Sequence, residues 1–251
     1  MPFFKFKGEQ LYYTDKGKGK PILLIHGFLG SHKVWQKSST DLLKGFRVIS
    51  IDLPGHGLSN PLGYVHSMEM YAECIHTLFS YLKLRKVNMV GHSLGGYVAV
   101  AFAEYYPDKV KSLILINSTA KGDSIMRKRE REKIIAQLQK KRNLVLDLLV
   151  NSFFIVPSRL KRYWVASYLN QALVCSNQGI AATIRGMKDR KEREIILKFA
   201  PYPVLIIAGI DDPLISVEQS KEESRLAKNG HFILLEKSGH MALYEEPYRL
   251  G

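Results

Sequence analysis

The chain has 251 residues, of which 46% are hydrophobic and 24% charged, and its formal net charge is +14 at pH 7. This length and composition fit one large globular domain, or a core with an inserted subdomain, and they exclude a disordered or low-complexity protein. Cys74 and Cys175 are too few and too far apart in sequence for a disulfide scaffold or a cysteine-rich metal site.

The sequence shows no clear signal peptide and no clear membrane-spanning segment. The N-terminal stretch MPFFKFKGEQ has no basic region followed by an apolar run, so it does not resemble a secretory signal. The most apolar segment elsewhere, LVLDLLVNSFFIV at 144–156, is too short and too interrupted to span a bilayer. The sequence therefore predicts a soluble, cytoplasmic protein with no transmembrane segment.

Strand and helix patterns alternate along most of the chain. Alternation over residues 3–15 predicts a hairpin of two edge strands, and the apolar run PILLIH at 21–26 predicts a strand buried on both faces. The same criteria then predict a series of further elements: a helix at 34–44, a strand at 46–52, a helix at 67–83, strands at 86–90, 111–117 and 201–209, a helix at 217–228 and a strand at 231–236. This order is typical of an α/β fold with a mostly parallel central sheet flanked by helices.

A long helical and basic segment interrupts this alternation. Residues 119–195 contain no pattern of a buried strand, and their length exceeds what one crossover connection needs. We predict that they form an inserted helical lid, or cap, and that residues 1–118 and 196–251 form the core. Ordinary crossover helices are the alternative.

One serine lies at a strand-to-helix junction. The stretch VNMVGHSLGGYVAVAFAEYYP at 87–107 places Ser93 between Gly91 and Gly95, after a strand pattern and before a helical one. The glycines can simply connect the two elements. They can also allow a turn so tight that the serine side chain projects as a nucleophile.

A serine nucleophile needs a base, a group that orients the base, and donors for the oxyanion. The sequence supplies each of these after a predicted strand. HGF at 26–28 can present the backbone N–H of Phe28, and the N–H of Leu94 opens the helix after the serine. AGIDDP at 208–213 supplies a carboxylate and KSGHM at 237–241 supplies His240. The order Ser, Asp, His is the one expected for this architecture.

Five ordered blocks carry a resemblance to the α/β-hydrolase fold: LLIHGFLGSHKVW, VISIDLPGHGLS, NMVGHSLGGYVA, LIIAGIDDPLIS and LEKSGHMALYEEP. The resemblance implies Ser93 as nucleophile, His240 as base, and the backbone N–H groups of Phe28 and Leu94 as the oxyanion hole. The family's spacing from Gly209 implies Asp212, rather than Asp211, as the acid.

The chain departs from the family pattern at Ser216, where a proline is frequent. The remaining histidines are expected to be structural: His26 as a hydrogen-bonding residue, His92 in packing at the elbow, and His56 with Asp52 in a turn. His32, His66, His76 and His231 have no supporting context in the sequence. Because no histidine–carboxylate cluster has metal-ligand spacing, we expect neither a metal nor a cofactor.

Ser93 at the position of the nucleophile favours acyl chemistry. Haloalkane dehalogenases and epoxide hydrolases of this fold use an aspartate as nucleophile instead. The sequence therefore predicts a serine hydrolase, a carboxylesterase, that cleaves a small apolar or anionic ester through an acyl-enzyme. Carbon–carbon bond hydrolysis and peracid formation use the same triad and remain open. A non-enzymatic or weakly catalytic small-molecule sensor of this fold is a further alternative.

Positive charge is concentrated in the predicted lid. Residues 119–195 contain 17 lysines and arginines against 7 aspartates and glutamates, a net charge of +10, which leaves +4 for the rest of the chain. These charges can form a solvated surface, or they can steer an acidic partner such as an acyl carrier protein or an anionic lipid. Nucleic acid fits less well, because no motif of interleaved aromatic and basic residues accompanies the charge. The apolar segment 144–156, with Tyr163, Trp164 and Tyr168, is expected to form lid core, an acyl pocket, or both.

Overall fold

A central sheet of eight strands organises the molecule. The computed structural model describes residues 2–155 and 159–250. The strands are β1 (Phe3–Phe6), β2 (Glu9–Lys16), β3 (Lys20–Ile25), β4 (Phe46–Ile51), β5 (Val87–His92), β6 (Val110–Ile116), β7 (Val204–Gly209) and β8 (Gly230–Leu235). Their order in the sheet is β1-β2-β4-β3-β5-β6-β7-β8. All neighbours from β4 to β8 are parallel, and β1 and β2 form an antiparallel extension at one edge. The predicted fold class is confirmed.

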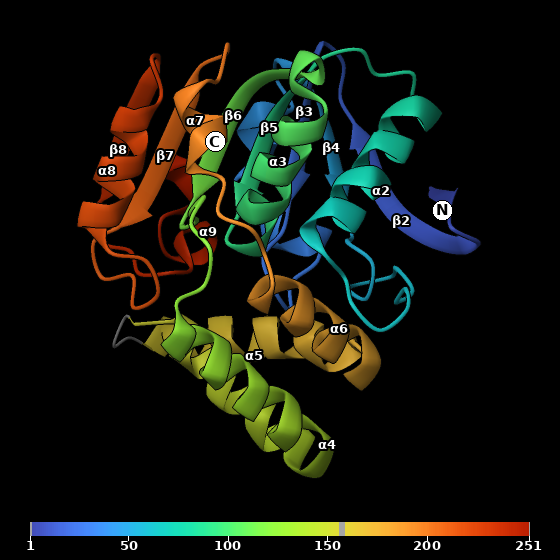
Figure 1. The fold of residues 1–251 in the computed structure, drawn as a ribbon, viewed down its shortest axis with the longest axis vertical. Coiled ribbons are helices and arrows are strands. Elements are labelled where there is room, and N and C mark those ends of the chain that lie inside the picture. Colours follow the sequence, from blue (N-terminus) through green and yellow to red (C-terminus); the bar gives the residue numbers. More distant parts are fainter. Residues whose placement is uncertain (1, 156–158, 251) are drawn as a thin grey trace.

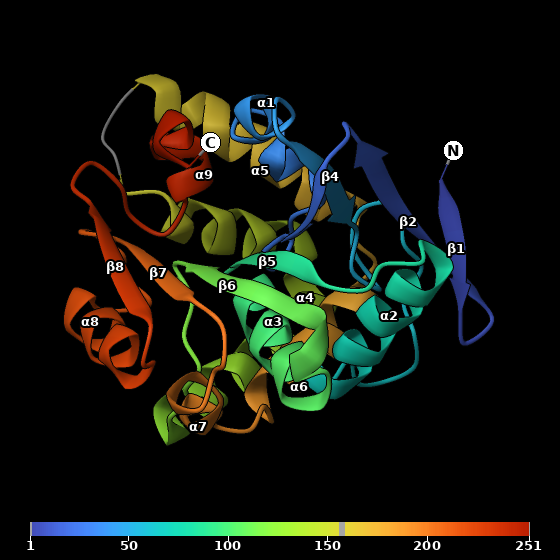
Figure 2. The same cartoon turned by 90° about the horizontal axis from the view of Figure 1, so that it is seen from above.

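The parallel strands are the ones with continuous apolar runs. The last four residues of β3 and of β4 are fully buried, as expected for strands covered on both faces. Figure 2 shows helices on both sides of the sheet. One side carries α2 (Met68–Tyr81), α3 (Leu94–Tyr105) and α8 (Val217–Leu226), and the other carries the short helices α1 (Ser39–Leu42) and α9 (Ala242–Glu245).

The prediction of one continuous helix at 34–44 is wrong. A short 3₁₀ turn at His32–Trp35 is followed by α1, which covers only Ser39–Leu42. The Thr40 hydroxyl donates to the backbone carbonyl of Gln36 between these two pieces. Serine and threonine side chains compete in this way for backbone groups, which weakens a helix interior.

In the described part of the chain, four helices connect β6 to β7. They are α4 (Ile125–Phe153), α5 (Arg159–Val174), α6 (Asn177–Lys188) and the short α7 (Glu194–Lys198). Figure 1 shows α4, α5 and α6 gathered beyond one end of the sheet. The longest of them, α4, is kinked at Lys141, whose φ of −140° and ψ of 48° are not helical.

The carboxyl ends of the strands face α4, α5 and α6. The Tyr168 hydroxyl on α5 donates to the carbonyl of Phe28, three residues after β3. The backbone N–H of His66, before α2, donates to the carbonyl of Ala182 on α6. These helices therefore cover the edge of the sheet at which ligands bind in parallel α/β folds. Within residues 2–155 and 159–250, none of the helices is long and apolar enough to cross a bilayer.

Candidate active site

Ser93 occupies a strained turn between β5 and α3. Its φ of 49° and ψ of −115° lie in a region that residues other than glycine rarely adopt. Its backbone N–H donates to the carbonyl of Ile116 at 3.0 Å, which ties the turn to the neighbouring strand β6. The backbone strain therefore lies at Ser93, whose hydroxyl is at the carboxyl edge of the sheet.

The glycines on either side of Ser93 permit this turn. A Cβ atom on Gly91 would lie 2.3 Å from the carbonyl oxygen of Gly95, and one on Gly95 would lie 2.1 Å from that of Ile25. Both distances are far shorter than van der Waals contact. Only glycine fits at either position, so the G-x-S-x-G spacing is a packing requirement of this turn.

The structure brings the three predicted side chains together. The Nε2 atom of His240 lies 2.9 Å from Oγ of Ser93. The Nδ1 atom of the same ring lies 2.9 and 3.1 Å from the two carboxylate oxygens of Asp212. The side chains of His240 and Asp212 are 3% and 1% exposed, so their pairing is shielded from water. Asp211 is exposed and lies in the turn before Asp212.

Asp212 is held as an ionised hydrogen-bond acceptor. The backbone N–H of Leu214 donates to its Oδ1 at 2.8 Å, and Nδ2 of Asn117 donates to its Oδ2 at 2.9 Å. Burial acts to raise the Asp212 pKa, but the His240 ring and these donors outweigh it and lower the pKa below its ordinary value. Asp212 therefore carries its negative charge at neutral pH.

Asn117 was not predicted from the sequence as part of this site. Besides Asp212, its amide donates to the carbonyl of Gly239 in the loop that carries His240, at 3.0 Å. Asn117 directly follows β6 and has a φ of 48°. Its position at the end of a buried strand, next in the sheet to the strand that leads to Ser93, was the signal that could have identified it.

The loop of His240 is fixed on two sides. Nε2 of His92 donates to the carbonyl of His240 at 2.9 Å. Burial lowers the pKa of His92 to about 3, so this ring is neutral and acts as a support. On the other side, the backbone N–H of Gly239 donates to Oε2 of Glu245 at 2.7 Å.

The two predicted oxyanion donors lie at the same edge as Ser93. Leu94 is the first residue of α3, where a helix leaves its backbone N–H without an intrahelical partner. Phe28 lies in the turn after β3, which the hydrogen bond from the Gly30 N–H to the Gly27 carbonyl closes at 3.1 Å. Tyr168 donates to the Phe28 carbonyl at 2.7 Å and so fixes the orientation of this peptide segment.

The other histidines are buried structural residues or lie outside the site. Nε2 of His26 accepts the Leu53 N–H at 3.0 Å, and its Nδ1 donates to the Gly27 carbonyl at 2.7 Å. Asp52 stabilises a turn as expected, since it accepts the Leu58 N–H. The Asp52 carboxylate also pairs with the ring of His32, whose Nδ1 atom lies 2.9 Å from Oδ1 of Asp52. This pair was not predicted from the sequence.

A pocket of about 120 Å³ opens at Ser93 and His240. One part of its wall is apolar and includes Leu149 and Phe153 of α4 and Met241. Other apolar residues of the same segment are buried, among them Val145, Leu146, Val150 and Phe154. The described residues of 144–156 therefore supply both buried core and pocket wall, and the predicted acyl binding stays a prediction. The last residue of the segment, Val156, lies outside the described part of the chain. Tyr163 is 68% exposed and belongs to neither.

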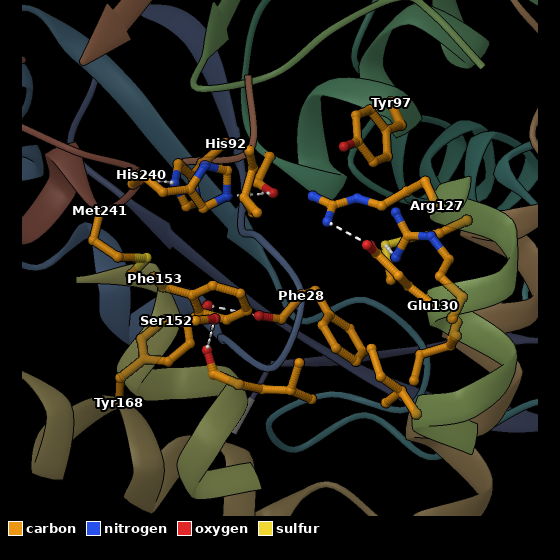
Figure 3. Close-up of a pocket in the computed structure, with 17 residues that line it drawn as sticks. Phe28, His92, Tyr97, Arg127, Glu130, Ser152, Phe153, Tyr168, His240 and Met241 are labelled. Carbon is orange, nitrogen blue, oxygen red and sulfur yellow. Dashed lines mark hydrogen bonds and ion pairs between the residues drawn. The ribbon is translucent and has the colours of Figure 1, made fainter. Parts of the chain in front are cut away.

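The opposite part of the wall is charged. Arg127, Glu130 and Arg131 of α4 line the pocket together with Tyr97 of α3. Figure 3 shows Arg127 pointing from α4 into the pocket, across from His92 and His240. The basic residues of 119–195 were expected to form a solvated surface or to steer an acidic partner, and their place in this pocket was not predicted.

Comparison with known proteins shows the family to which this chain belongs. The family model described as the alpha/beta hydrolase fold matches residues 20–247. The chain belongs to the α/β-hydrolase family. This confirms the resemblance seen in the five sequence blocks.

Individual relatives differ in their reactions. The chain is 27% identical over 255 residues to the (E)-2-((N-methylformamido)methylene)succinate hydrolase of Acinetobacter baylyi, which covers 96% of this chain and 90% of that protein. A solved structure of a thermophilic esterase from Thermogutta terrifontis, with malate bound, matches with a TM-score of 0.92 and 28% identity over 99% of this chain and 93% of the other.

A third comparison supports the fold alone. The enol-lactonase from Burkholderia xenovorans matches with a TM-score of 0.87 and 21% identity, and covers 98% of this chain and 95% of that one. Together the comparisons identify this α/β-hydrolase as a hydrolase and leave its bond and its substrate to be inferred from the site.

Proposed function

We propose that this α/β-hydrolase is a serine hydrolase that cleaves a carboxylic ester, or a related acyl bond, through an acyl-enzyme. The observation that carries the proposal is the continuous hydrogen-bonded chain from Ser93 through His240 to Asp212, with Ser93 in a strained turn beside a pocket. The esterase that resembles this chain at 28% identity supports the choice of an ester.

In the first half-reaction, Oγ of Ser93 attacks the carbonyl carbon of the ester while Nε2 of His240 takes the hydroxyl proton. Asp212 holds the ring so that Nδ1 carries a proton and Nε2 is free to accept one, and it stabilises the imidazolium that forms. The backbone N–H groups of Phe28 and Leu94 donate to the oxyanion. When the tetrahedral intermediate collapses, the leaving alcohol takes the proton from Nε2.

In the second half-reaction, water replaces the alcohol. His240 removes a proton from water, the resulting hydroxide attacks the acyl carbon, and the proton returns from Nε2 to Oγ of Ser93 as the carboxylic acid leaves. The same side chains therefore act twice, and the reaction consumes one water for each ester bond.

A series of p-nitrophenyl esters from acetate to dodecanoate tests this function. Because the pocket at Ser93 is only about 120 Å³ and partly apolar, we expect kcat/KM to be highest for short or medium acyl chains and to fall for the longest. Binding of these esters without turnover would contradict the proposal and support the sensor alternative. Turnover of a carbon–carbon bond substrate or peracid formation, with no ester hydrolysis, would reassign the reaction.

We further propose that the exposed basic surface of α4 attracts an acidic partner that presents the acyl group, such as an acyl carrier protein. Lys128 and Lys133, which form this surface, are exposed on the helix. The predicted lid, 119–195, has a net charge of +10. Charge of one sign beside a binding site raises the association rate of a ligand of the opposite sign.

The salt dependence of kcat/KM tests this partner. With an acyl group on an acidic carrier, kcat/KM should fall steeply as salt is raised, because the Debye length shortens below ~10 Å above 0.1 M. Reversing the charges of Lys128 and Lys133 should flatten this dependence, while a neutral p-nitrophenyl ester serves as the matched control. Parallel salt profiles for the two substrates would show that the basic surface serves only solvation. Selective binding of the protein to anionic vesicles would point to a lipid instead.

A further inference from the structure

The charged wall of the pocket is built on α4. Arg127 and Glu130 lie one helical turn apart and form an ion pair, with 3.0 Å between Nη1 of Arg127 and Oε2 of Glu130. Figure 3 shows this pair facing the pocket, with Tyr97 beside it and His240 on the far side. A guanidinium therefore lies in the same pocket as Ser93, separated from it by space that a substrate can occupy.

Arg127 has unused capacity to bind an anion. Its side chain is 36% exposed and that of Glu130 is 53% exposed. Exposed ion pairs contribute little, so a ligand carboxylate can displace Glu130 at small cost. Within residues 2–155 and 159–250, the guanidinium makes a hydrogen bond only through Nη1, although it carries five N–H donors.

The groups behind Arg127 do not neutralise this wall. Asp123 is 3% exposed and is shared by two guanidiniums, those of Arg131 and Arg190. Nη1 of Arg131 lies against Sδ of Met187 at 3.5 Å, and Met187 itself lines the pocket. These groups comprise three guanidiniums, those of Arg127, Arg131 and Arg190, and two carboxylates, those of Asp123 and Glu130, so one positive charge remains in excess.

Arg190 adds rigidity to the arrangement. Its guanidinium stacks on the ring of Tyr97 at 4.0 Å, and Nε donates to the carbonyl of Lys121. The side chain is 5% exposed, so this cation is fixed behind the pocket wall. Arg127 lines the pocket and is the most exposed of the three cations, so it is the one that a ligand reaches most easily.

We propose that the pocket selects substrates that carry a carboxylate at the end remote from the scissile bond, and that Arg127 binds this carboxylate. The inference rests on the proposed ester hydrolysis and specifies its substrate class: half-esters of dicarboxylic acids, or esters of comparable shape. The apolar part of the pocket wall, which includes Leu149, Phe153 and Met241, accommodates the methylene groups that separate the two ends. Glu130 is the internal anion that the substrate displaces.

The test compares two esters that differ only in charge. One is the p-nitrophenyl half-ester of adipic or suberic acid, and the other has the terminal carboxylate replaced by a primary amide. We expect the wild-type protein to prefer the carboxylate. The variant Arg127→Gln should lower the ratio of the two kcat/KM values by roughly tenfold to a hundredfold, as for the loss of a charge-assisted hydrogen bond. Glu130→Gln should raise the ratio, because it removes the competing anion.

Arg129→Gln is the matched control. It makes the same substitution and the same change in net charge two residues away, on an exposed position of the same helix. We expect it to leave the ratio unchanged. An equal fall in Arg127→Gln and Arg129→Gln would overturn the subsite, since the effect would then be long-range attraction.

A binding measurement separates this inference from the proposed function. In Ser93→Ala the half-ester can bind without being cleaved, so calorimetry gives its affinity directly. Weaker binding of the half-ester in Ser93→Ala/Arg127→Gln supports the subsite even if no ester is turned over. Equal affinity in the two proteins, or equal binding of the carboxylate and the amide, overturns it. Hydrolysis of the neutral ester with no preference for the carboxylate would leave the serine hydrolase standing and remove the subsite alone.

Discussion

Replacing Ser93 by alanine should abolish ester hydrolysis. The oxyanion donors and the pocket remain in this variant, but neither can supply a nucleophile, and loss of the serine in a serine protease costs roughly 10⁶-fold in kcat. The measurement is kcat for the best p-nitrophenyl ester. A fluorophosphonate probe should label the wild-type protein at Ser93 and leave the variant unlabelled. Labelling of another serine, or full activity in the variant, would contradict the mechanism.

The variant Ser93→Gly separates catalysis from folding at the same position. Glycine adopts a φ of 49° without the steric cost that a side chain meets there. Relief of this strain is worth on the order of 1 kcal/mol, or a rise in Tm of about 2–4 °C for a protein of this size. We expect Ser93→Gly to be inactive yet more stable than the wild type. A large loss of stability would mean that the serine hydroxyl, and not the turn, dominates the free energy of unfolding at this site.

Replacing Asp212 by asparagine should lower kcat by roughly 10⁴-fold, the effect of the same change in a serine protease. An asparagine amide turned toward Nδ1 of His240 would favour the tautomer with its proton on Nε2, which cannot accept the Ser93 proton. The amide also places a donor where Asn117 and Leu214 now donate. Activity should therefore fall far more than binding, which makes kcat against KM the decisive comparison.

Asp211→Asn is the control for this prediction. Asp211 is exposed in the turn, and its backbone N–H donates to the carbonyl of Ser238 at 3.1 Å. The substitution keeps that backbone contact, so we expect only a small change in kcat. If Asp211→Asn were the inactive variant and Asp212→Asn the active one, the acid would be Asp211.

The core strands could be predicted from the sequence because burial acts on each strand locally. PILLIH is a continuous apolar run and FRVISID was predicted as a second strand, and they form β3 and β4 at the centre of the sheet. The predicted order of serine, acid and base was also visible, since each of these residues lies in the turn or loop that follows a strand. Over 34–44, where the local preference for a helix is weak, the structure has two short helical segments in place of the one predicted helix. The boundaries of the predicted lid stay a prediction.

The sequence by itself determined the parallel sheet, the tight turn at Ser93 and the residues at the strand ends, because strand burial and turn geometry depend on neighbours close in the chain. Only the tertiary structure decided what those residues meet. Asn117 reaches Asp212 across 95 positions of sequence, and Tyr168 reaches Phe28 across 140. From the sequence, the basic residues of α4 could form a solvated surface or steer an acidic partner, and packing determines which of them face the pocket. The rotation of α4 turns Arg127 toward Ser93 and leaves Arg129 in solvent, a difference that charge and spacing along the chain do not encode.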